Sequence, residues 1–266
     1  MAQHRRSQYM QENGAGGLTR NRAKLKTKKI SKQSNNMPFQ QLKNWLYDHI
    51  ILEIRDIKSL QQLMPLYDDY LPWSGASIRP STLVYILNDI MINDRKVIVE
   101  CGSGVSTLLI ARYIQKMGRE ISFYSIDHDS HWLDKIREEL KKQDLTEFVQ
   151  IIHAPLVHSS MCWSDEHKWY DMKLIGESFN ETNIDLLIVD GPPANQKGLE
   201  FSRFPAVPYF KSWLKSNYKV ILDDAGRPAE NRISKEWGKQ LDTTFEQDLL
   251  HGNVYVGCGG ELFYNI

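Results

Sequence analysis

The chain has 266 residues, of which 41% are apolar and 25% charged, and its formal net charge is zero. This size and composition are typical of a protein that buries one substantial core, and no apolar run approaches the roughly 20 residues of a membrane-spanning helix. Three scattered cysteines form neither a CxxC pair nor a disulfide framework. We therefore expect a soluble protein of the cytoplasm.

Residues 1–36 carry nine Lys and Arg residues against a single acid, Glu12, and almost no aliphatic side chains. Such a segment cannot offset the entropy of ordering by burial, so it is predicted to be a disordered basic tail. Its charge would suit nucleic acid or an anionic membrane surface. A solvated extension without a partner is the interpretation that we favour.

Residues 37–95 are predicted to form N-terminal helices and a lid. Apolar residues recur at helical spacing in "PFQQLKNWLYDHIILEI", and "SLQQLMPLYDDYLP" predicts a second, shorter helix interrupted by Pro65. In "STLVYILNDIMI", Ser81 is expected to cap a further helix.

From residue 96 to residue 266, short Val, Ile and Leu runs alternate with amphipathic segments, which predicts an α/β core domain. Runs of this kind are typical of a parallel sheet covered by helices on both faces. After residue 239, "TTFEQDLL" and "NVYVGCG" predict a C-terminal antiparallel hairpin strand, so we expect a mostly parallel sheet. The predicted parallel strands are 96–100, 121–127, 148–152, 184–190 and 219–224.

Acidic residues end four of these five runs. In open parallel sheets the ligand lies beyond the carboxyl ends of the strands, so this recurrence predicts a ligand cleft there. The residues at these ends are Glu100, Asp127, Asp190, Asp223 and Asp224, with His153 and Ala154 after the remaining strand.

The stretch "VECGSGVST" (99–107) joins the first predicted strand to a helix through a glycine turn. No Lys follows Gly104, which excludes a phosphate-binding P-loop. The dinucleotide fingerprint needs glycine at position 107, where this chain has Thr107. The carboxylate of Glu100 would repel a pyrophosphate, so the turn predicts a phosphate-free ligand.

The same stretch resembles the first motif of the class I S-adenosylmethionine-dependent methyltransferases, which have a Rossmann-like sheet. S-Adenosylmethionine carries an ammonium, a sulfonium and a ribose diol but no phosphate. Asp127 matches the acid that binds the ribose in this family, and His128, His153 and Ala154 fall where the adenine rests. The resemblance implies that the donor contacts Glu100, Gly102, Ser103, Gly104, Ser106, Thr107, Asp127, His128, His153, Ala154 and Asp190.

A narrower resemblance, carried by "WYD", "IDLLIVDGPPA", "SRFPAVPYF" and "ILDDAGRPAE", is to methyltransferase family 24, related to the catechol and macrocin O-methyltransferases. It implies that Asp190, Asp223 and Asp224 bind a divalent cation such as Mg²⁺ and that Asp190 and Asp223 are catalytic. The catechol enzymes place a lysine base where this chain has Pro193. The alternative is that these acids cap a turn or pair with Arg227.

Two further groups of residues are ambiguous. The cluster His153, His158, Cys162 and His167 matches no zinc pattern, and its aromatic surroundings predict a loop that shapes a pocket. Arg203 and Arg227 can recognise an anionic group, although surface ion pairs are the commoner role of such residues.

These features predict a methyltransferase that transfers a methyl group to oxygen of a small hydroxylated molecule of the sugar or natural-product type, assisted by a divalent metal. An RNA or other nucleic-acid methyltransferase is the first alternative. From other classes, an NAD-type oxidoreductase and a non-catalytic adenosyl-ligand binder remain open. The sequence leaves the oligomeric state open.

Overall fold

The computed structural model of the chain describes residues 38–67, 69–179 and 183–261. The chain divides into two compact units, Met1–Ile50 and Ile51–Ile266. Among described residues, the first unit contains the beginning of helix α2 (Phe39–Leu63). The second unit contains the sheet and the candidate site. The predicted basic tail, 1–36, lies outside the described residues, and the proposed boundary between 37–95 and 96–266 stays a prediction.

The second unit is built on a seven-stranded sheet with the order β3-β2-β1-β6-β7-β9-β8. Strands β3, β2, β1, β6 and β7 are parallel, whereas β9 is antiparallel to both β7 and β8. The predicted α/β fold and its C-terminal antiparallel hairpin are therefore confirmed. The strands are β1 (Val97–Cys101), β2 (Ser122–Asp127), β3 (Gln150–His153), β6 (Ile184–Val189), β7 (Leu214–Leu222), β8 (Phe245–Asp248) and β9 (Val254–Cys258).

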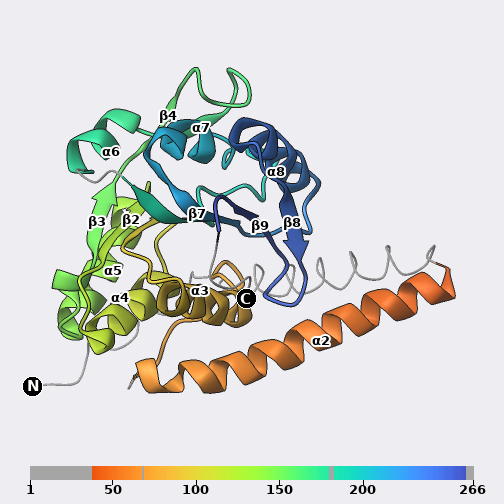
Figure 1. Cartoon of the computed structure of the whole chain (residues 1–266), viewed down its shortest axis with the longest axis horizontal. Coiled ribbons are helices and arrows are strands. Elements are labelled where there is room, and N and C mark those ends of the chain that lie inside the picture. The colour runs from red at the N-terminus through yellow and green to blue at the C-terminus, as the bar shows by residue number, and fades with distance from the viewer. Residues whose placement is uncertain (1–37, 68, 180–182, 262–266) are drawn as a thin grey trace, which may run out of the picture. The chain divides into compact units, whose positions relative to one another are not determined.

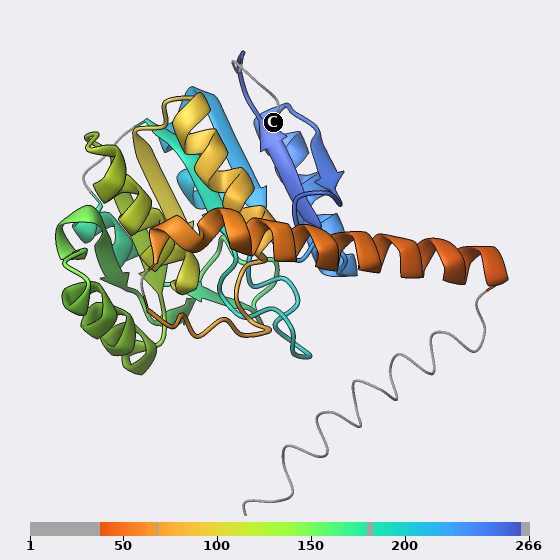
Figure 2. The same ribbon diagram turned by 90° about the horizontal axis from the view of Figure 1, so that it is seen from below.

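Helices cover both faces of this sheet (Figures 1 and 2). One face packs against α3 (Pro80–Ile92), α4 (Val105–Met117) and α5 (Ser130–Lys142). The opposite face packs against α6 (Met172–Ser178), α7 (Ala206–Phe210) and α8 (Pro228–Leu241).

Two apolar layers result from the alternation of side chains along the strands. Ile98 and Ile188 belong to the layer beneath α3 and α4, whereas Val99 and Leu187 belong to the layer beneath α7 and α8. Because both faces are buried, the central strands are apolar at successive positions. The strand ends are consequently held rigidly at one edge of the sheet.

The segment that connects β3 to β6 along the chain forms a small, separate antiparallel sheet, which was not predicted. It consists of β4 (Leu156–His158) and β5 (Lys168–Tyr170), and Trp169 and Tyr170 at its end are fully buried. This hairpin carries Tyr170 into the wall of the cleft described below.

Two local predictions in the N-terminal region are wrong. The chain forms one helix, α2, where two were expected, and Pro65 lies in a short 3-10 turn, Met64–Leu66, after the helix has ended. Ser81 does not cap α3, which begins at Pro80. The Ser81 backbone amide and hydroxyl instead donate to the Asp56 carboxylate, at 3.0 and 2.6 Å, because that acid is buried beside the start of α3.

None of the helices in the described part of the chain combines the length and apolar character needed to cross a membrane.

Candidate active site

A cleft of about 410 Å³ lies beyond the carboxyl ends of β1, β2, β6 and β7. This is the edge at which parallel α/β sheets bind ligands. Its walls come from the glycine turn after β1, the end of β2, the turns after β6 and β7, and the loop before α3. The lining includes residues 74–78, 102–106, 127–129 and 190–195, together with Trp132, Tyr170, Arg203, Asp223, Asp224 and Arg227.

The glycine turn brings backbone close to the ligand space. Gly102 has a φ of +100°, and a Cβ there would lie 2.8 Å from the backbone nitrogen of Gly191, so only glycine fits. A Cβ at Gly104 would meet no protein atom within 4 Å, because this residue faces the open cleft. Helix α4 starts directly after it, so free backbone amides lie at this wall.

Glu100 lies behind the turn and not on the cleft wall. Its carboxylate accepts hydrogen bonds from Ser106 Oγ (2.5 Å), Thr107 Oγ1 (2.6 Å) and Ser125 Oγ (2.7 Å), and the residue is 1% exposed. Burial raises the pKa of Glu100 to about 6. The expectation that this carboxylate points into the ligand space is wrong, because the three hydroxyl groups hold it behind the turn and the residue does not line the cleft. Glu100 supports the first turn of α4.

Thr107 also supports the turn from behind. Its Oγ1 accepts from the Gly104 amide at 2.9 Å and donates to Glu100, and the residue is fully buried. Ser103 and Ser106, by contrast, line the cleft. Their direct contact with a donor stays a prediction.

Asp127 ends β2 in the wall of the cleft. Its Oδ2 accepts from the Ser103 amide at 3.0 Å and its Oδ1 from the Asp129 amide at 2.9 Å. Because each carboxylate oxygen has two lone pairs, Oδ2 keeps capacity for a further donor, such as a ribose hydroxyl. His128 Nδ1 lies 3.1 Å from Asp127 Oδ1, and the hydrogen bond to this acid raises the pKa of His128.

The three residues predicted at the adenine occupy different places. His128 lines the cleft, whereas His153 and Ala154 lie behind it. His153 Nε2 is 3.1 Å from the His128 carbonyl, and the Ala154 amide donates to the Asp127 carbonyl at 2.9 Å. They therefore hold the end of β2 in place, and their contact with adenine stays a prediction.

Trp132 belongs to the cleft wall. Its indole Nε1 donates to the Ser103 carbonyl at 2.7 Å. Trp132 follows soon after the end of β2, and this position was a signal available in the sequence, because the first turn of a following helix borders the ligand edge.

Asp190, Asp223 and Asp224 come together, as expected. One oxygen from each carboxylate can be chosen so that all three lie within 4.8 Å of one another. Burial, followed by the charge of Asp223, raises the pKa of Asp190 well above its usual value. Burial, followed by the charge of Asp224, raises the pKa of Asp223 to about 6. The cluster therefore favours the binding of positive charge.

Two arginines contact this cluster. Arg203, with a side chain 4% exposed, lies 3.1 Å from Asp190 Oδ1 and 3.0 Å from Asp224 Oδ2. Arg227 lies 2.7 Å from Asp224 Oδ2 and 3.5 Å from the buried Glu230. With all groups ionised, the three aspartates and Glu230 carry four negative charges against two positive charges. That fully ionised state would leave an excess of two negative charges beside the cleft, and a bound cation would favour it, because positive charge opposes the raised pKa values of Asp190 and Asp223.

No sequence pattern indicates that Arg203 contacts the acidic cluster. Residue 203 lies in the segment between β6 and α7, and its guanidinium returns to the ends of β6 and β7. Arg203 does form ion pairs, but not on the surface, because its side chain is buried among carboxylates. The alternative that the acids pair with Arg227 is correct for Asp224.

Tyr170 belongs to the aromatic segment that was expected to shape a pocket, and it lines the cleft. Its side chain is fully buried, and its hydroxyl has no hydrogen-bond partner among described residues. A Cβ at Gly191 would lie 2.4 Å from this hydroxyl, so the absence of a side chain at Gly191 makes room for it. Tyr170 thus closes the cleft between Asp127 and Asp190.

The histidine and cysteine residues of the 153–167 segment do not form a metal site. Among described residues, the three aspartates make up the group of His, Cys, Asp and Glu side chains close enough to hold an ion. His167 Nδ1 instead lies 2.7 Å from Ser164 Oγ.

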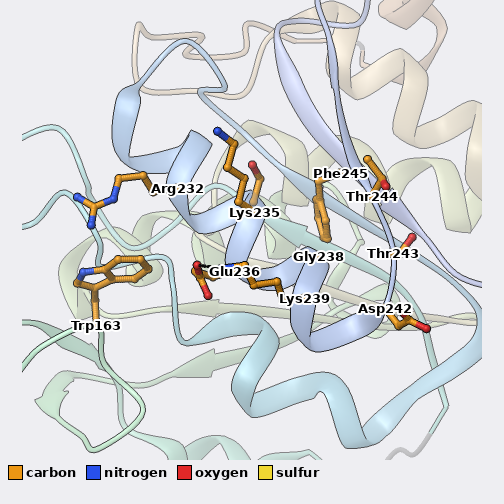
Figure 3. A pocket seen from close by; sticks show the side chains of 11 residues that line it. Trp163, Arg232, Lys235, Glu236, Gly238, Lys239, Asp242, Thr243, Thr244 and Phe245 are labelled. Atoms are coloured by element: carbon orange, nitrogen blue, oxygen red, sulfur yellow. Dashed lines mark hydrogen bonds and ion pairs between the residues drawn. The ribbon is translucent and has the colours of Figure 1, made fainter.

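A second, shallower hollow of about 760 Å³ lies along α8 and β8 (Figure 3). Arg232 stands over the ring of Trp163, 5.1 Å from its centroid, and Lys239 pairs with Glu236 at 2.6 Å. None of the predicted donor or metal residues lines this hollow. The chemistry indicated by the motifs therefore belongs to the cleft at the strand ends.

Comparisons with known proteins agree with this architecture. Residues 99–225 match the family described as a methyltransferase domain. A methyltransferase of Podospora anserina, solved with S-adenosylhomocysteine bound, is similar with a TM-score of 0.55 and 13% identity over 85% of this chain and 98% of that chain. No curated protein matches the chain.

An O-methyltransferase of Bacillus cereus, also solved with S-adenosylhomocysteine, gives a TM-score of 0.49 and 12% identity over 78% of this chain and 90% of that chain. The Podospora anserina structure supports the fold, and the match to the methyltransferase domain covers the glycine turn and all three aspartates. The resemblance to the class I methyltransferases of family 24 is thus confirmed over residues 99–225.

Proposed function

We propose that this enzyme transfers a methyl group from S-adenosylmethionine to an oxygen of a small hydroxylated molecule. The observation that supports this proposal is one cleft with two chemically different ends. Asp127 and the glycine turn lie at one end, and the acidic cluster of Asp190, Asp223 and Asp224 lies at the other.

The first end suits the adenosyl part of the donor. Asp127 Oδ2 retains acceptor capacity for a ribose hydroxyl, and Gly104 leaves open space beside the first amides of α4. The cleft has the volume of a site for one small molecule and its reacting partner group. This arrangement favours a small acceptor over a nucleic acid, for which the argument depends on the basic tail.

The second end suits the sulfonium and the acceptor hydroxyl. The excess of negative charge attracts the positive sulfonium. The new O–C bond forms as the S–C bond breaks, the donor leaves as a neutral thioether, and a carboxylate of Asp190 or Asp223 takes the hydroxyl proton. Arg203 cannot serve as the base, since its pKa is raised above the ordinary arginine value by nearby acids that outweigh its burial.

The acidic cluster also fits a divalent cation. Two excess negative charges balance one dication, and carboxylate oxygens are the ligands that Mg²⁺ prefers. We propose that Asp190, Asp223 and Asp224 hold it through the oxygens that the arginines leave free. A bound Mg²⁺ would lower the pKa of the acceptor hydroxyl.

Calorimetry with S-adenosylhomocysteine, with and without Mg²⁺, tests the proposal. We expect wild-type binding and a loss of about tenfold to 100-fold for Asp127→Ala, because each hydrogen bond to a charged group contributes about 1.5–3 kcal/mol. Asp134→Ala is the matched control, since Asp134 is exposed and pairs with Arg137. Absence of wild-type binding would refute the donor assignment.

Methyl transfer is then measured with labelled donor and a panel of hydroxylated acceptors and RNA. Transfer to a hydroxylated acceptor supports the proposal, whereas transfer to RNA alone would show that the acceptor is RNA and not a small molecule. Donor binding without transfer to any acceptor would indicate a binding protein, and binding of NAD in place of the adenosyl ligand would indicate an oxidoreductase. We also propose a cytoplasmic location, supported by three cysteines that are all free thiols.

A further inference from the structure

Arg203 contacts backbone from two neighbouring strand ends. Its guanidinium donates to the carbonyl oxygens of Asp190 and Pro192, which follow β6, and of Asp223, which follows β7. The Pro192 and Asp223 distances are 3.4 and 3.2 Å. These carbonyls lie 11 to 20 positions away in the chain, so one side chain connects its own segment to two distant strand ends.

The same guanidinium contacts carboxylates from both strand ends. Nη2 lies 3.1 Å from Asp190 Oδ1, and Nη1 lies 3.0 Å from Asp224 Oδ2. Arginine can do this because its planar fork presents five N–H groups in fixed directions, whereas a lysine ammonium acts from one point.

Arg227 differs in this respect, although it contacts the same cluster. Its two acidic partners, Asp224 and Glu230, are each three residues away in the chain, and its side chain is 32% exposed. Arg227 therefore adds charge locally, whereas Arg203 connects the turn after β6 to the turn after β7.

We infer that Arg203 is a positioning residue, whose guanidinium holds the turns after β6 and β7 together so that Asp190, Asp223 and Asp224 form one cation-binding cluster. It occupies one oxygen each of Asp190 and Asp224 and leaves the other oxygens of these acids for a cation. The positioning of the acids is inferred from the contacts of Arg203 alone, whereas the use of the cluster in methyl transfer rests on the proposed function.

A simpler role would be that of a counter-ion, and the two roles predict opposite changes in Mn²⁺ affinity when Arg203 is replaced by methionine. If Arg203 only neutralised charge, Arg203→Met would leave a more negative cluster, and Mn²⁺, used as a probe for Mg²⁺, would bind more tightly. If Arg203 positions the acids, both Arg203→Met and Arg203→Lys bind Mn²⁺ more weakly. The lysine variant keeps the charge and loses the fork.

The experiment combines Mn²⁺ titration by electron paramagnetic resonance with hydrogen exchange of the full chain. We expect Mn²⁺ affinity to fall by about tenfold or more in both variants, since a lysine does not replace a bidentate arginine. The amides of Asp190, Gly191, Asp223 and Ala225, hydrogen-bonded to neighbouring segments, should exchange faster. The amides of Gly102 and Ala154 should not change.

Arg112→Lys is the matched control. The Arg112 guanidinium also bridges two elements, donating to Gln115 in α4 and to Gln143 after α5, and Arg112 is not part of the cleft wall. The Arg112→Lys variant should leave the Mn²⁺ affinity unchanged, and likewise the hydrogen exchange of the four strand-end amides named above.

Tighter Mn²⁺ binding by Arg203→Met, or unchanged exchange in Arg203→Lys, would overturn the inference. If Arg203→Met does not fold, Arg203→Lys decides by the same measurements. Should the wild type bind no Mn²⁺, the metal part of the proposed function is wrong, and the exchange data alone decide on Arg203. Should it bind no S-adenosylhomocysteine, the donor assignment fails while the result for Arg203 stands.

Discussion

The indole Nε1 of Trp132 donates a 2.7 Å hydrogen bond to the carbonyl of Ser103, and so ties the first turn of α5 to the glycine turn after β1. The Ser103 amide donates to Asp127 at 3.0 Å. Ser103 is thus held through its carbonyl by α5 and through its amide by the end of β2. The glycine turn and the proposed ribose acid form one rigid half of the cleft.

Trp132→Phe removes this hydrogen bond and keeps most of the packing. We expect the affinity for S-adenosylhomocysteine to fall about threefold to tenfold, in line with 0.5–1.5 kcal/mol for a neutral hydrogen bond. Trp237→Phe is the control, because the Trp237 indole donates to the Phe204 carbonyl at 2.8 Å outside the cleft lining. A similar loss of affinity in both variants would show that the effect is general and not local.

Alanine should destabilise the fold at Gly102 but not at Gly104, two glycines of the same turn. Gly102→Ala forces a side chain onto the Gly191 backbone at a φ of +100°, and should cost about 1–3 kcal/mol in the free energy of unfolding. Gly104→Ala meets no protein atom and should change that free energy by less than about 0.5 kcal/mol.

The Gly104→Ala substitution, which the fold should tolerate, should nevertheless weaken binding of the donor. The methyl group of Gly104→Ala would project into the cleft, so we expect S-adenosylhomocysteine to bind at least about tenfold more weakly, the equivalent of 1.4 kcal/mol. Urea unfolding and calorimetry on the same samples check both statements. Unimpaired binding by this variant would place the donor elsewhere.

Glu100 gives a pH-dependent contribution to stability. Its pKa is raised by burial from 4.5 to about 6, so the folded state holds this proton more tightly than the unfolded state does. Below pH 4.5 the group is protonated in both states and costs nothing. Between pH 4.5 and 6 the free energy of unfolding falls, by about 2 kcal/mol for a shift of this size.

Glu100→Gln isolates this contribution. Since glutamine does not titrate, the free energy of unfolding of the wild type minus that of the variant should fall by about 2 kcal/mol across this range and then stay level. Urea unfolding at a series of pH values measures this difference. A difference that rises with pH would mean that the three hydroxyl donors outweigh burial, and that the pKa of Glu100 is lowered.

A buried ion cluster away from the cleft makes a separate prediction about stability. Asp89 lies 2.7 Å from Arg95 Nε and 2.6 Å from Lys219 Nζ, and all three side chains are at most 1% exposed. Asp89→Asn leaves two buried cations without a counter-charge and should cost about 3–5 kcal/mol. Lys219→Met leaves a neutral Asp89–Arg95 pair and should cost clearly less in thermal unfolding. Equal losses would contradict this account.

The acidic cluster was predictable because it depends only on topology. The carboxyl ends of adjacent parallel strands meet at one edge of the sheet, so Asp127, Asp190 and Asp223 reach the cleft however the side chains pack. The mostly parallel sheet and its terminal hairpin were predictable for a similar reason, since each strand carries its own apolar run and turn.

The contacts that the sequence did not reveal come from segments whose place depends on tertiary packing. Arg203 lies in a segment with little regular structure, and the aromatic segment that carries Tyr170 forms a short hairpin that pairs only with itself. No local periodicity reports which distant strand end such a residue contacts. The orientation of Glu100 was accessible, because strand alternation places it on the same face as Ile98, toward α4.

Gly102 and Gly191 form a seam without side chains between β1 and β6. A Cβ on Gly191 would lie 2.7 Å from the Gly102 Cα, and a Cβ on Gly102 would lie 2.8 Å from the Gly191 nitrogen, so each glycine excludes a side chain from the other. Neither substitution can be rescued by changing the second position, because both are already as small as residues can be. In a saturation-mutagenesis library this pair should therefore tolerate no replacement.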